Sequence, residues 1–276
     1  MHRPDITRIA EQSKAKAAYL DGMPMGYLIL SALAGVYLGF GITLIFSIGA
    51  PFAAAGSPAV KLVMGAFFGM VLALVIFAGS ELFTGNNMVC AIGAFDGVIS
   101  WGAVSRIWTL SLAGNLVGSL GLAWLVAQSG VLSQAPQLDL LMKVASVKMH
   151  LSGWELLVRG ILCNWLVCLA VWTAGRTTND IAKVVLMVWC LFAFVGSGFE
   201  HSIANQSLLG MALFLPHPAS VSWTGFLWNQ LHVVVGNIIG GSVFVGGLYW
   251  LASVPVPRAH AQVTPSSVPS HSATTS

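Results

Sequence analysis

The stretch GSGFEHSIAN, residues 196–205, places a carboxylate and an imidazole side by side within an otherwise apolar run. Ionisable side chains are costly in such a segment, so Glu200 and His201 are expected to face a cavity or other polar groups and to serve a function. Imidazole is the side chain whose proton can move near physiological pH. A histidine here can meet an entering anion as a proton donor and take the proton back later. The pattern therefore predicts an anion site centred on His201.

The composition identifies the surroundings of this site. Of the 276 residues, 57% are hydrophobic and only 8% are charged, whereas a soluble domain carries roughly a quarter charged residues. So few charges cannot cover a surface in water, so we predict an integral membrane protein in contact with lipid. The net charge of +3 gives no sign of a nucleic-acid partner. The cysteines are expected to be buried thiols without disulfide or metal: Cys90, Cys163, Cys168 and Cys190.

Six apolar segments are long enough to cross a bilayer, whose hydrocarbon core takes about 20 helical residues. They are expected at 25–48, 59–83 (continuing with a break to 95), 103–127, 153–174, 181–199 (continuing with a break to 215) and 225–251. Residues 22–252 thus form the predicted transport domain. It lies between a cytoplasmic N-terminal segment (1–21) and a Ser- and Pro-rich tail (253–276) expected to be disordered.

Basic residues gather on one side of these spans, the side of both termini. They are Arg3, Arg8, Lys14, Lys16, Arg106, Arg176, Lys183 and Arg258. Because cytoplasmic loops carry the excess of Lys and Arg, we predict that both termini are cytoplasmic.

The second half of the chain repeats the first. LAGNLVGSLGLAWL matches VVGNIIGGSVFVGGLYWL around a shared GN-x-x-G, which pairs Asn115 with Asn237, and GSELFTGN matches GSGFEHSIAN. The repeats are assigned to residues 22–127 and 150–252. Three crossings are an odd number, so the second repeat must enter the membrane from the opposite side. Inverted repeats of this kind hold their substrate site at the interface between them.

The second and fifth spans carry Gly, Ser, Thr and Asn where a continuous helix would prefer Leu and Ala. Matching breaks in inverted repeats indicate a central site, and the half-helix N-termini offer N–H groups that suit an anion. Alternatively, the small residues only allow close helix packing, which accounts for GN-x-x-G but not for Glu81, Glu200 and His201. Both glutamates are expected to hold the breaks by accepting N–H bonds from the loops.

GSELFTGNN, RGILCNWLVCLAVW, SGFEHSIAN and the final GNIIGG resemble the signatures of the formate/nitrite transporter family, and the second and third resemble its nitrite branch most. The resemblance implies an all-α membrane protein with six transmembrane helices in two inverted three-helix repeats. Each protomer would be aquaporin-like, with helices 2 and 5 broken, and would assemble as a homopentamer in the bacterial inner membrane. It implies a channel for small monovalent anions, nitrite first, with formate, hydrosulfide or a short carboxylate as the alternative.

The resemblance also implies which residues line the path. His201 corresponds to the central histidine, Thr84 to the threonine of the opposite broken helix, and Lys148 to a vestibule lysine that attracts the anion by its charge. The expected substrate-path residues are His201, Thr84, Lys148, Asn164, Glu200 and Asn205. The expected apolar constrictions are formed by Phe68, Leu72, Leu82, Val167 and Phe194, with Phe83 nearby.

A bare anion does not pass such constrictions cheaply, because desolvating a charge costs more than desolvating a neutral acid. Transient protonation of the anion by His201 is therefore expected. The alternative is a stationary His201 that stabilises the anion only electrostatically.

Other classes of function find less support. A water or glycerol channel would carry NPA-type motifs at the breaks, which read LFTG and EHSIAN instead. No metal-ligand spacing, phosphate-binding loop or nucleophile–base pair indicates an enzyme, so we expect no cofactor and no metal. Glu155 and Arg159 predict an ion pair on a helix surface. The remaining histidines of the apolar region are expected in loops or at its interfaces: His150, His217 and His232.

Overall fold

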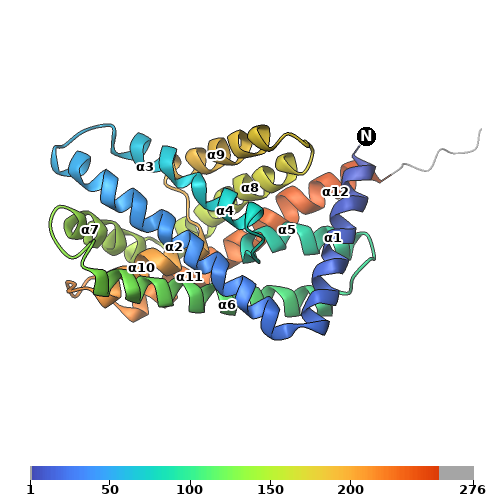
Figure 1. Cartoon of the computed structure of the whole chain (residues 1–276), viewed down its shortest axis with the longest axis horizontal. Coiled ribbons are helices and arrows are strands. Elements are labelled where there is room, and N and C mark those ends of the chain that lie inside the picture. The colour runs from blue at the N-terminus through green and yellow to red at the C-terminus, as the bar shows by residue number, and fades with distance from the viewer. Residues whose placement is uncertain (1, 255–276) are drawn as a thin grey trace, which may run out of the picture.

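The computed structural model describes residues 2–254, which form helices joined by loops (Figure 1). The elements are α1 (Arg3–Gly22), α2 (Pro24–Ala54), α3 (Val60–Phe68), α4 (Met70–Phe77), α5 (Phe83–Phe95), α6 (Trp101–Ser129), α7 (Gln137–His150), α8 (Gly153–Ala174), α9 (Asp180–Ser197), α10 (Ser202–Phe214), α11 (Trp223–Ile239), the π-helical η1 (Gly240–Gly247) and α12 (Leu248–Ser253). Arg258 and nearly all of the predicted tail lie outside the described residues.

Six apolar helical stretches of the described chain are long enough to cross a membrane. They are α2, α3 with α4, α6, α8, α9, and α11 with η1 and α12. The second and fifth spans are interrupted, at residues 78–82 before α5 and at 198–201 before α10. The predicted all-α fold with broken second and fifth helices is therefore confirmed.

Two further helices, α1 and α7, lie across opposite ends of the molecule (Figure 1). Neither was predicted as a helix from the sequence, and the apolar residues of each occupy one face only. That face is buried: it includes Ile6 and Ile9 on α1, and Leu141 and Ala145 on α7. We refer to the two ends as the α1 end and the α7 end.

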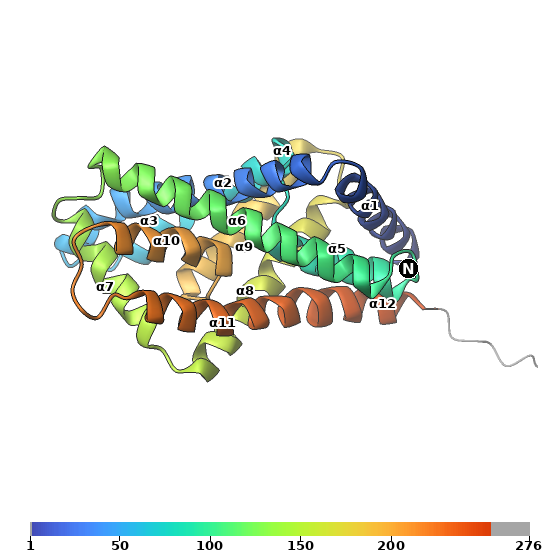
Figure 2. The same ribbon diagram turned by 90° about the horizontal axis from the view of Figure 1, so that it is seen from below.

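The two repeats are inverted. Helices α2 and α6 run from the α1 end to the α7 end, whereas their counterparts α8 and α11 run in the opposite direction (Figures 1 and 2). Helix α2 packs along α6, and α8 packs along α11. The first halves of the broken helices, α3 and α9, pack against each other, which brings the two breaks to the middle of the molecule.

The glycines of GN-x-x-G allow the close packing within each repeat. A Cβ on Gly118 of α6 would overlap the carbonyl of Ala32 in α2, and a Cβ on Gly236 of α11 would overlap the carbonyl of Leu157 in α8. Small residues permit this approach of two backbones, which gives helices in lipid their packing energy. The packing explanation of the motif is thus correct for its glycines.

The asparagine of the motif has a different role: it forms hydrogen bonds with backbone groups at the helix break. Oδ1 of Asn115 accepts the Phe83 N–H at 2.9 Å, and Nδ2 donates to the carbonyls of Ser31 at 2.7 Å and Glu81 at 2.9 Å. One buried side chain therefore serves two backbone groups of the break, the Phe83 N–H and the Glu81 carbonyl, and ties them to the Ser31 carbonyl of α2.

Asn237 repeats this arrangement in the second half. Its Oδ1 accepts the Ser202 N–H at 2.8 Å, and its Nδ2 donates to the carbonyls of Gly160 at 2.8 Å and Glu200 at 3.0 Å. Inside a membrane a broken helix is tolerated only where its freed backbone groups find partners. The first amide of each half-helix is thus bonded to an asparagine and is not free for an anion.

Replacing Asn115 by alanine is expected to lower the free energy of unfolding by at least about 2 kcal/mol, because the Phe83 N–H and the Glu81 carbonyl lose their partner and each such buried group costs about 1–3 kcal/mol. Thermal unfolding in detergent measures the loss. Ser119→Ala is the matched control: the residue lies one turn further along α6, and its buried Oγ has no hydrogen-bond partner among residues 2–254. Equal unfolding temperatures for the two variants would contradict this role of Asn115.

Candidate functional site

Two neighbouring cavities lie between the α1 end and His201. The larger, of about 780 Å³, is lined by residues of α1, α4, α5, α8 and α9 and by the loop before α5. The smaller has a volume of about 10 Å³ and is lined by His201 among apolar side chains. Leu72 and Leu82 line both cavities, so these two side chains separate them. We call the larger one the α1 cavity and the smaller one the central cavity.

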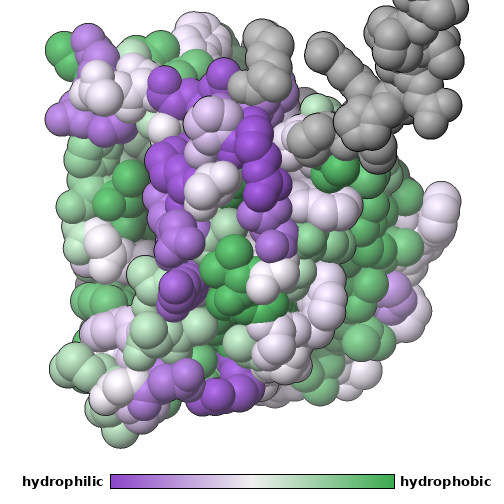
Figure 3. All heavy atoms as spheres, turned by 90° about the vertical axis from the view of Figure 1, so that its right-hand side faces the viewer, coloured by the Kyte–Doolittle hydropathy of each residue, from purple (hydrophilic) through white to green (hydrophobic). Residues whose placement is uncertain are grey.

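Figure 3 looks onto the α1 end. Hydrophilic residues gather in the middle of this face around a smaller hydrophobic patch, and hydrophobic residues cover much of its flanks. This distribution suits a mouth that opens into water between flanks that face lipid.

The central cavity is narrow. Its volume is close to the roughly 10–15 Å³ that a single water molecule needs. Its lining consists of Leu38, Phe68, Val71, Leu72, Leu82, Val167, Leu191, Phe194 and His201. An ion passing here must therefore leave nearly all of its hydration shell behind.

Five of the six residues proposed for the constrictions thus lie together around His201. Phe83 does not join them: it lines a separate groove between α6 and α11. Leu38, Val71 and Leu191 were not predicted as lining residues. Val71 and Leu191 could have been, because they stand three residues from Phe68 and Phe194 and so share their helix faces.

His201 is 3% exposed, and both ring nitrogens have partners. Nε2 lies 3.1 Å from Oγ1 of Thr84, across the interface of the two repeats. Nδ1 lies 3.2 Å from the backbone N of Ala204. Because a backbone N–H can only donate, Nδ1 is the acceptor and the hydrogen of the neutral ring is on Nε2. The ring also stacks on Phe194, with centroids 5.9 Å apart.

The break itself positions this ring. His201 precedes α10 in an extended conformation, with φ −106° and ψ 118°, and caps the helix through Nδ1. At the matching point of the first repeat, Leu82 precedes α5 with φ −95° and ψ 121°. The two breaks therefore share one backbone geometry, and only the second carries a polar side chain into the central cavity.

Glu200 and Lys148 form a largely buried ion pair towards the α7 end. Nζ of Lys148 lies 2.7 Å from Oε1 of Glu200, and the side chains are 17% and 2% exposed. Asn205 donates to the other carboxylate oxygen at 2.6 Å. The partners of this carboxylate are thus an ammonium and an amide, where the sequence analysis expected loop N–H groups. A carboxylate this deeply buried needs an opposite charge.

The first repeat contains the same arrangement. Nζ of Lys16, on α1, lies 2.6 Å and 2.7 Å from the two oxygens of Glu81, and Asn86 donates to Glu81 at 3.0 Å. Tyr27 adds a hydroxyl donor at 3.1 Å. Lys16 is therefore the counterpart of Lys148. This role of Lys16 was not predicted from the sequence. The available signal was the shared spacing of glutamate and asparagine, five residues apart in ELFTGN and in EHSIAN.

Asn164 supports the Thr84 turn. Its Nδ2 lies 3.1 Å from the Thr84 carbonyl and 2.6 Å from the Asn237 carbonyl. Asn164 does not line the central cavity, and Asn205 is engaged with Glu200. Of the six residues proposed for the substrate path, His201 and Thr84 meet at the centre, Lys148 and Glu200 lie beside them, and the two asparagines position them.

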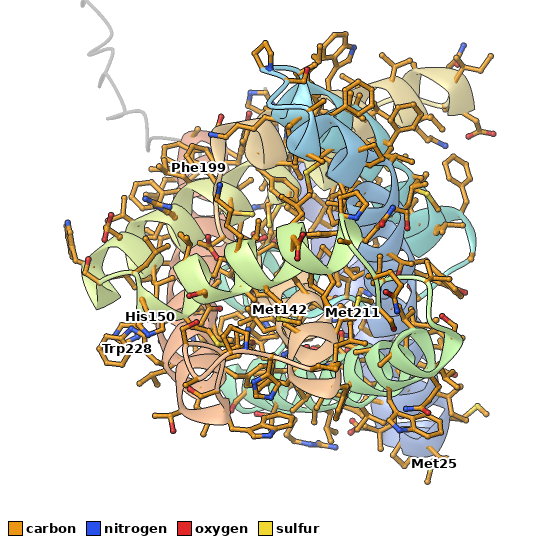
Figure 4. The ribbon with its side chains drawn as sticks, turned by 90° about the vertical axis from the view of Figure 1, so that its left-hand side faces the viewer. Met25, Met142, His150, Phe199, Met211 and Trp228 are labelled. Atoms are coloured by element: carbon orange, nitrogen blue, oxygen red, sulfur yellow. The ribbon has the colours of Figure 1, made fainter. Side chains whose placement is uncertain are left out.

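The other polar residues singled out in the sequence lie away from this centre. Glu155 and Arg159 form the expected ion pair, at 3.3 Å. Figure 4 faces the α7 end, and His150 and Trp228 lie next to each other at its edge. Nδ1 of His150 lies 2.8 Å from the Ser146 carbonyl, which is an ordinary contact at a helix end.

Six spans in two inverted halves, with two broken helices that meet at one buried histidine, define a membrane transport protein with a path through its own protomer. The family model described as formate/nitrite transporter matches residues 5–251. The nitrite transporter NirC of Escherichia coli (strain K12) is 40% identical over 264 residues, which cover 95% of this chain and 96% of that protein. The chain belongs to the formate/nitrite transporter family, as the resemblance predicted.

Solved structures agree with this assignment. A structure described as an FNT family ion channel matches with a TM-score of 0.87 and 40% identity, covering 91% of this chain and 100% of that one. A pentameric formate channel with formate bound matches with a TM-score of 0.69 and 30% identity, covering 83% and 96%. Membership of this family makes the chain a multi-pass transport protein and not an enzyme.

Proposed function

We propose that this protein is a nitrite channel of the bacterial inner membrane, with one anion path in each protomer. The observation that carries the proposal is the pairing of His201 with Thr84 at the narrowest cavity, where the rest of the lining is apolar. The preference for nitrite rests on the similarity to NirC, at 40% identity, which exceeds the 34% identity to the formate channel FocA of the same organism. Formate is the second candidate.

The path has three stages. Lysines at both ends, Lys16 and Lys148, present ammonium groups to an approaching anion, although each is paired with a glutamate. The apolar side chains around the central cavity then exclude water. At the centre, the Nε2 hydrogen of His201 turns from Thr84 to the anion and replaces part of its lost hydration. Hydrogen bonds to a charged acceptor are the stronger kind.

Transient protonation of the anion has a structural condition. If the neutral ring gave up its Nε2 hydrogen, it would become an imidazolate unless Nδ1 gained a proton first. Nδ1 accepts the Ala204 N–H at 3.2 Å, so this cap must open before His201 can lend a proton. We therefore propose that His201 is a hydrogen-bond donor in the described conformation and a proton donor only after the cap has opened.

The assembly and orientation complete the proposal. A homopentamer is supported by the pentameric formate channel that this chain resembles. Cytoplasmic termini are supported by the basic residues of the α1 end, where Arg3, Arg106 and Arg176 lie. We further propose that residues 22–252 form the transport domain, with α1 packed onto the first repeat and α7 associated with the second, because each of these helices supplies a lysine to the glutamate of that repeat.

Flux into liposomes tests the function. Purified protein in proteoliposomes is expected to carry nitrite at a saturable rate well above that of protein-free vesicles, and to carry formate more slowly at equal concentration. A nitrite-selective electrode and labelled formate measure the two rates. Formate flux faster than nitrite flux would assign the protein to formate, and flux of neither anion would overturn the proposal.

A further inference from the structure

We infer that Arg8 forms a further anion-binding point, in the α1 cavity, where it holds a planar anion before that anion passes Leu72 and Leu82. The inference rests on the proposed function for the identity of the anion. The site is separate from the His201–Thr84 pair and from both lysine–glutamate pairs.

Three cationic side chains line the α1 cavity: Arg8, Lys16 and Lys183. Two of them are paired with carboxylates that line the same cavity. Lys16 contacts both oxygens of Glu81, and Lys183 lies 2.8 Å from Asp180. These pairs reduce the net charge that Lys16 and Lys183 present to an anion.

Arg8 is the exception among the three. Its Nη2 lies 3.9 Å from Oδ1 of Asp5, at the limit of an ion pair, while the other oxygen of Asp5 lies 3.5 Å from Arg176. Nη2 is buried and has no hydrogen-bond partner within the described residues. The side chain as a whole is 37% exposed and lines the cavity, so an anion there can reach the exposed part of the side chain. With no carboxylate in close contact, the guanidinium presents positive charge at the cavity wall, which attracts an anion.

The Arg8 head lies over Gly175. A Cβ on Gly175 would lie 2.7 Å from Nη2, 2.8 Å from Nη1 and 3.1 Å from Cζ. The two terminal nitrogens are thus nearly equidistant from that point, and the guanidinium occupies the space that a side chain would take. The φ of Gly175 is −70°, which any residue can adopt. The glycine is therefore needed for room and not for its backbone freedom.

The chemistry of the guanidinium suits the proposed substrate. Its N–H groups lie in one plane and form forks that match the two oxygens of a planar carboxylate. Nitrite and formate present two oxygens in the same kind of planar arrangement. A lysine ammonium at this place would attract the anion without orienting it.

Helix α7 has no equivalent of Arg8. Lys148 and Lys16 are counterparts, 132 residues apart (148 − 16), and the same offset places Leu140 opposite Arg8. Helix α7 contains no arginine. The inference therefore predicts a directional effect, which appears only when the anion enters from the α1 end.

The experiment measures initial rates of nitrite uptake in right-side-out and everted vesicles from bacteria that lack their own nitrite transporters. Protease removal of an N-terminal tag shows which vesicles expose the α1 end. In those vesicles, Arg8→Gln is expected to raise the half-saturating nitrite concentration about three- to tenfold, as expected for one charge-assisted hydrogen bond near the surface. The maximal rate, and uptake from the α7 end, are expected to stay unchanged.

Three further variants separate anion binding from a structural role. Gly175→Ala keeps the charge but displaces the guanidinium, so it is expected to raise half-saturation like Arg8→Gln. Arg8→Lys is expected to restore half-saturation only part of the way to the wild-type value. Lys183→Gln, the control, is expected to leave half-saturation unchanged. The inference is overturned if half-saturation in Arg8→Gln equals the wild-type value or shifts equally from both ends. It is also overturned if only the maximal rate and the unfolding temperature change, as a packing role would produce.

The proposed function fails separately, if wild-type vesicles carry no nitrite. In that case the same half-saturation series is run with formate, and the result for Arg8 is read in the same way.

Discussion

Replacing His201 by leucine is expected to reduce nitrite flux through the protomer by about ten- to a hundredfold, the value of a hydrogen bond to a charged acceptor. The fold should survive, because Leu82 occupies the matching position of the first repeat with nearly the same φ and ψ. What disappears is the one polar group that lines the central cavity. Nitrite flux into proteoliposomes, with the unfolding temperature as a check on folding, measures the effect.

His201→Asn distinguishes the two roles of the ring. Asparagine can cap α10 and donate a hydrogen bond, but it does not titrate. If the wild type carries protons with nitrite, a pH-sensitive dye inside the liposomes should report acidification that vanishes in His201→Asn. A pH-independent nitrite current in the wild type would rule out proton exchange and leave the electrostatic role. Wild-type flux in His201→Leu would remove this histidine from the mechanism altogether.

The second large effect concerns the buried pair of Lys148 and Glu200. Lys148→Ala is expected to lower the free energy of unfolding by about 3–5 kcal/mol, because a buried carboxylate is left without its opposite charge. It is also expected to weaken nitrite uptake at low substrate concentration, because an ammonium near the α7 end is lost. Thermal unfolding and uptake as a function of nitrite concentration measure the two effects independently.

The double variant Lys148→Met/Glu200→Gln separates stability from attraction. Without a carboxylate, no buried charge is left unpaired, so the unfolding temperature is expected to recover while uptake at low nitrite remains weak. The pair Lys16→Met/Glu81→Gln in the first repeat is the matched comparison for the opposite end. If the double variant restores uptake together with stability, Lys148 has only a structural role.

The sequence predicted the fold well and placed the two helix breaks, which meet at Thr84 and His201, because both features depend on local patterns. Apolar runs indicated the six spans, and Gly, Ser, Thr and Asn indicated the breaks near Thr84 and His201. The side chains that pair with the buried carboxylates were harder to predict. Glu81 and Glu200 were expected to accept loop N–H bonds, but their carboxylates contact Lys16 and Lys148, which lie 65 and 52 residues away in the chain.

The residues of the constriction were likewise predicted only in part. Phe68, Leu72, Leu82, Val167 and Phe194 were named as constriction residues because of the family resemblance, and they do surround His201. Phe83 is just as apolar and only one residue from Leu82, yet its side chain lies in the groove between α6 and α11. Adjacent residues at a helix start point to different sides, and composition does not reveal which side faces the path.

By itself, the sequence determined a membrane protein with two inverted halves, two broken helices and one imidazole at depth in GSGFEHSIAN. These properties follow from hydrophobicity, spacing and internal repetition, which are all read along the chain. The tertiary structure alone decided that Nδ1 of His201 caps α10, that Asn115 and Asn237 hold the breaks, and that Arg8 rests on Gly175. Those contacts depend on which groups packing brings within hydrogen-bond distance, and packing joins residues from different helices.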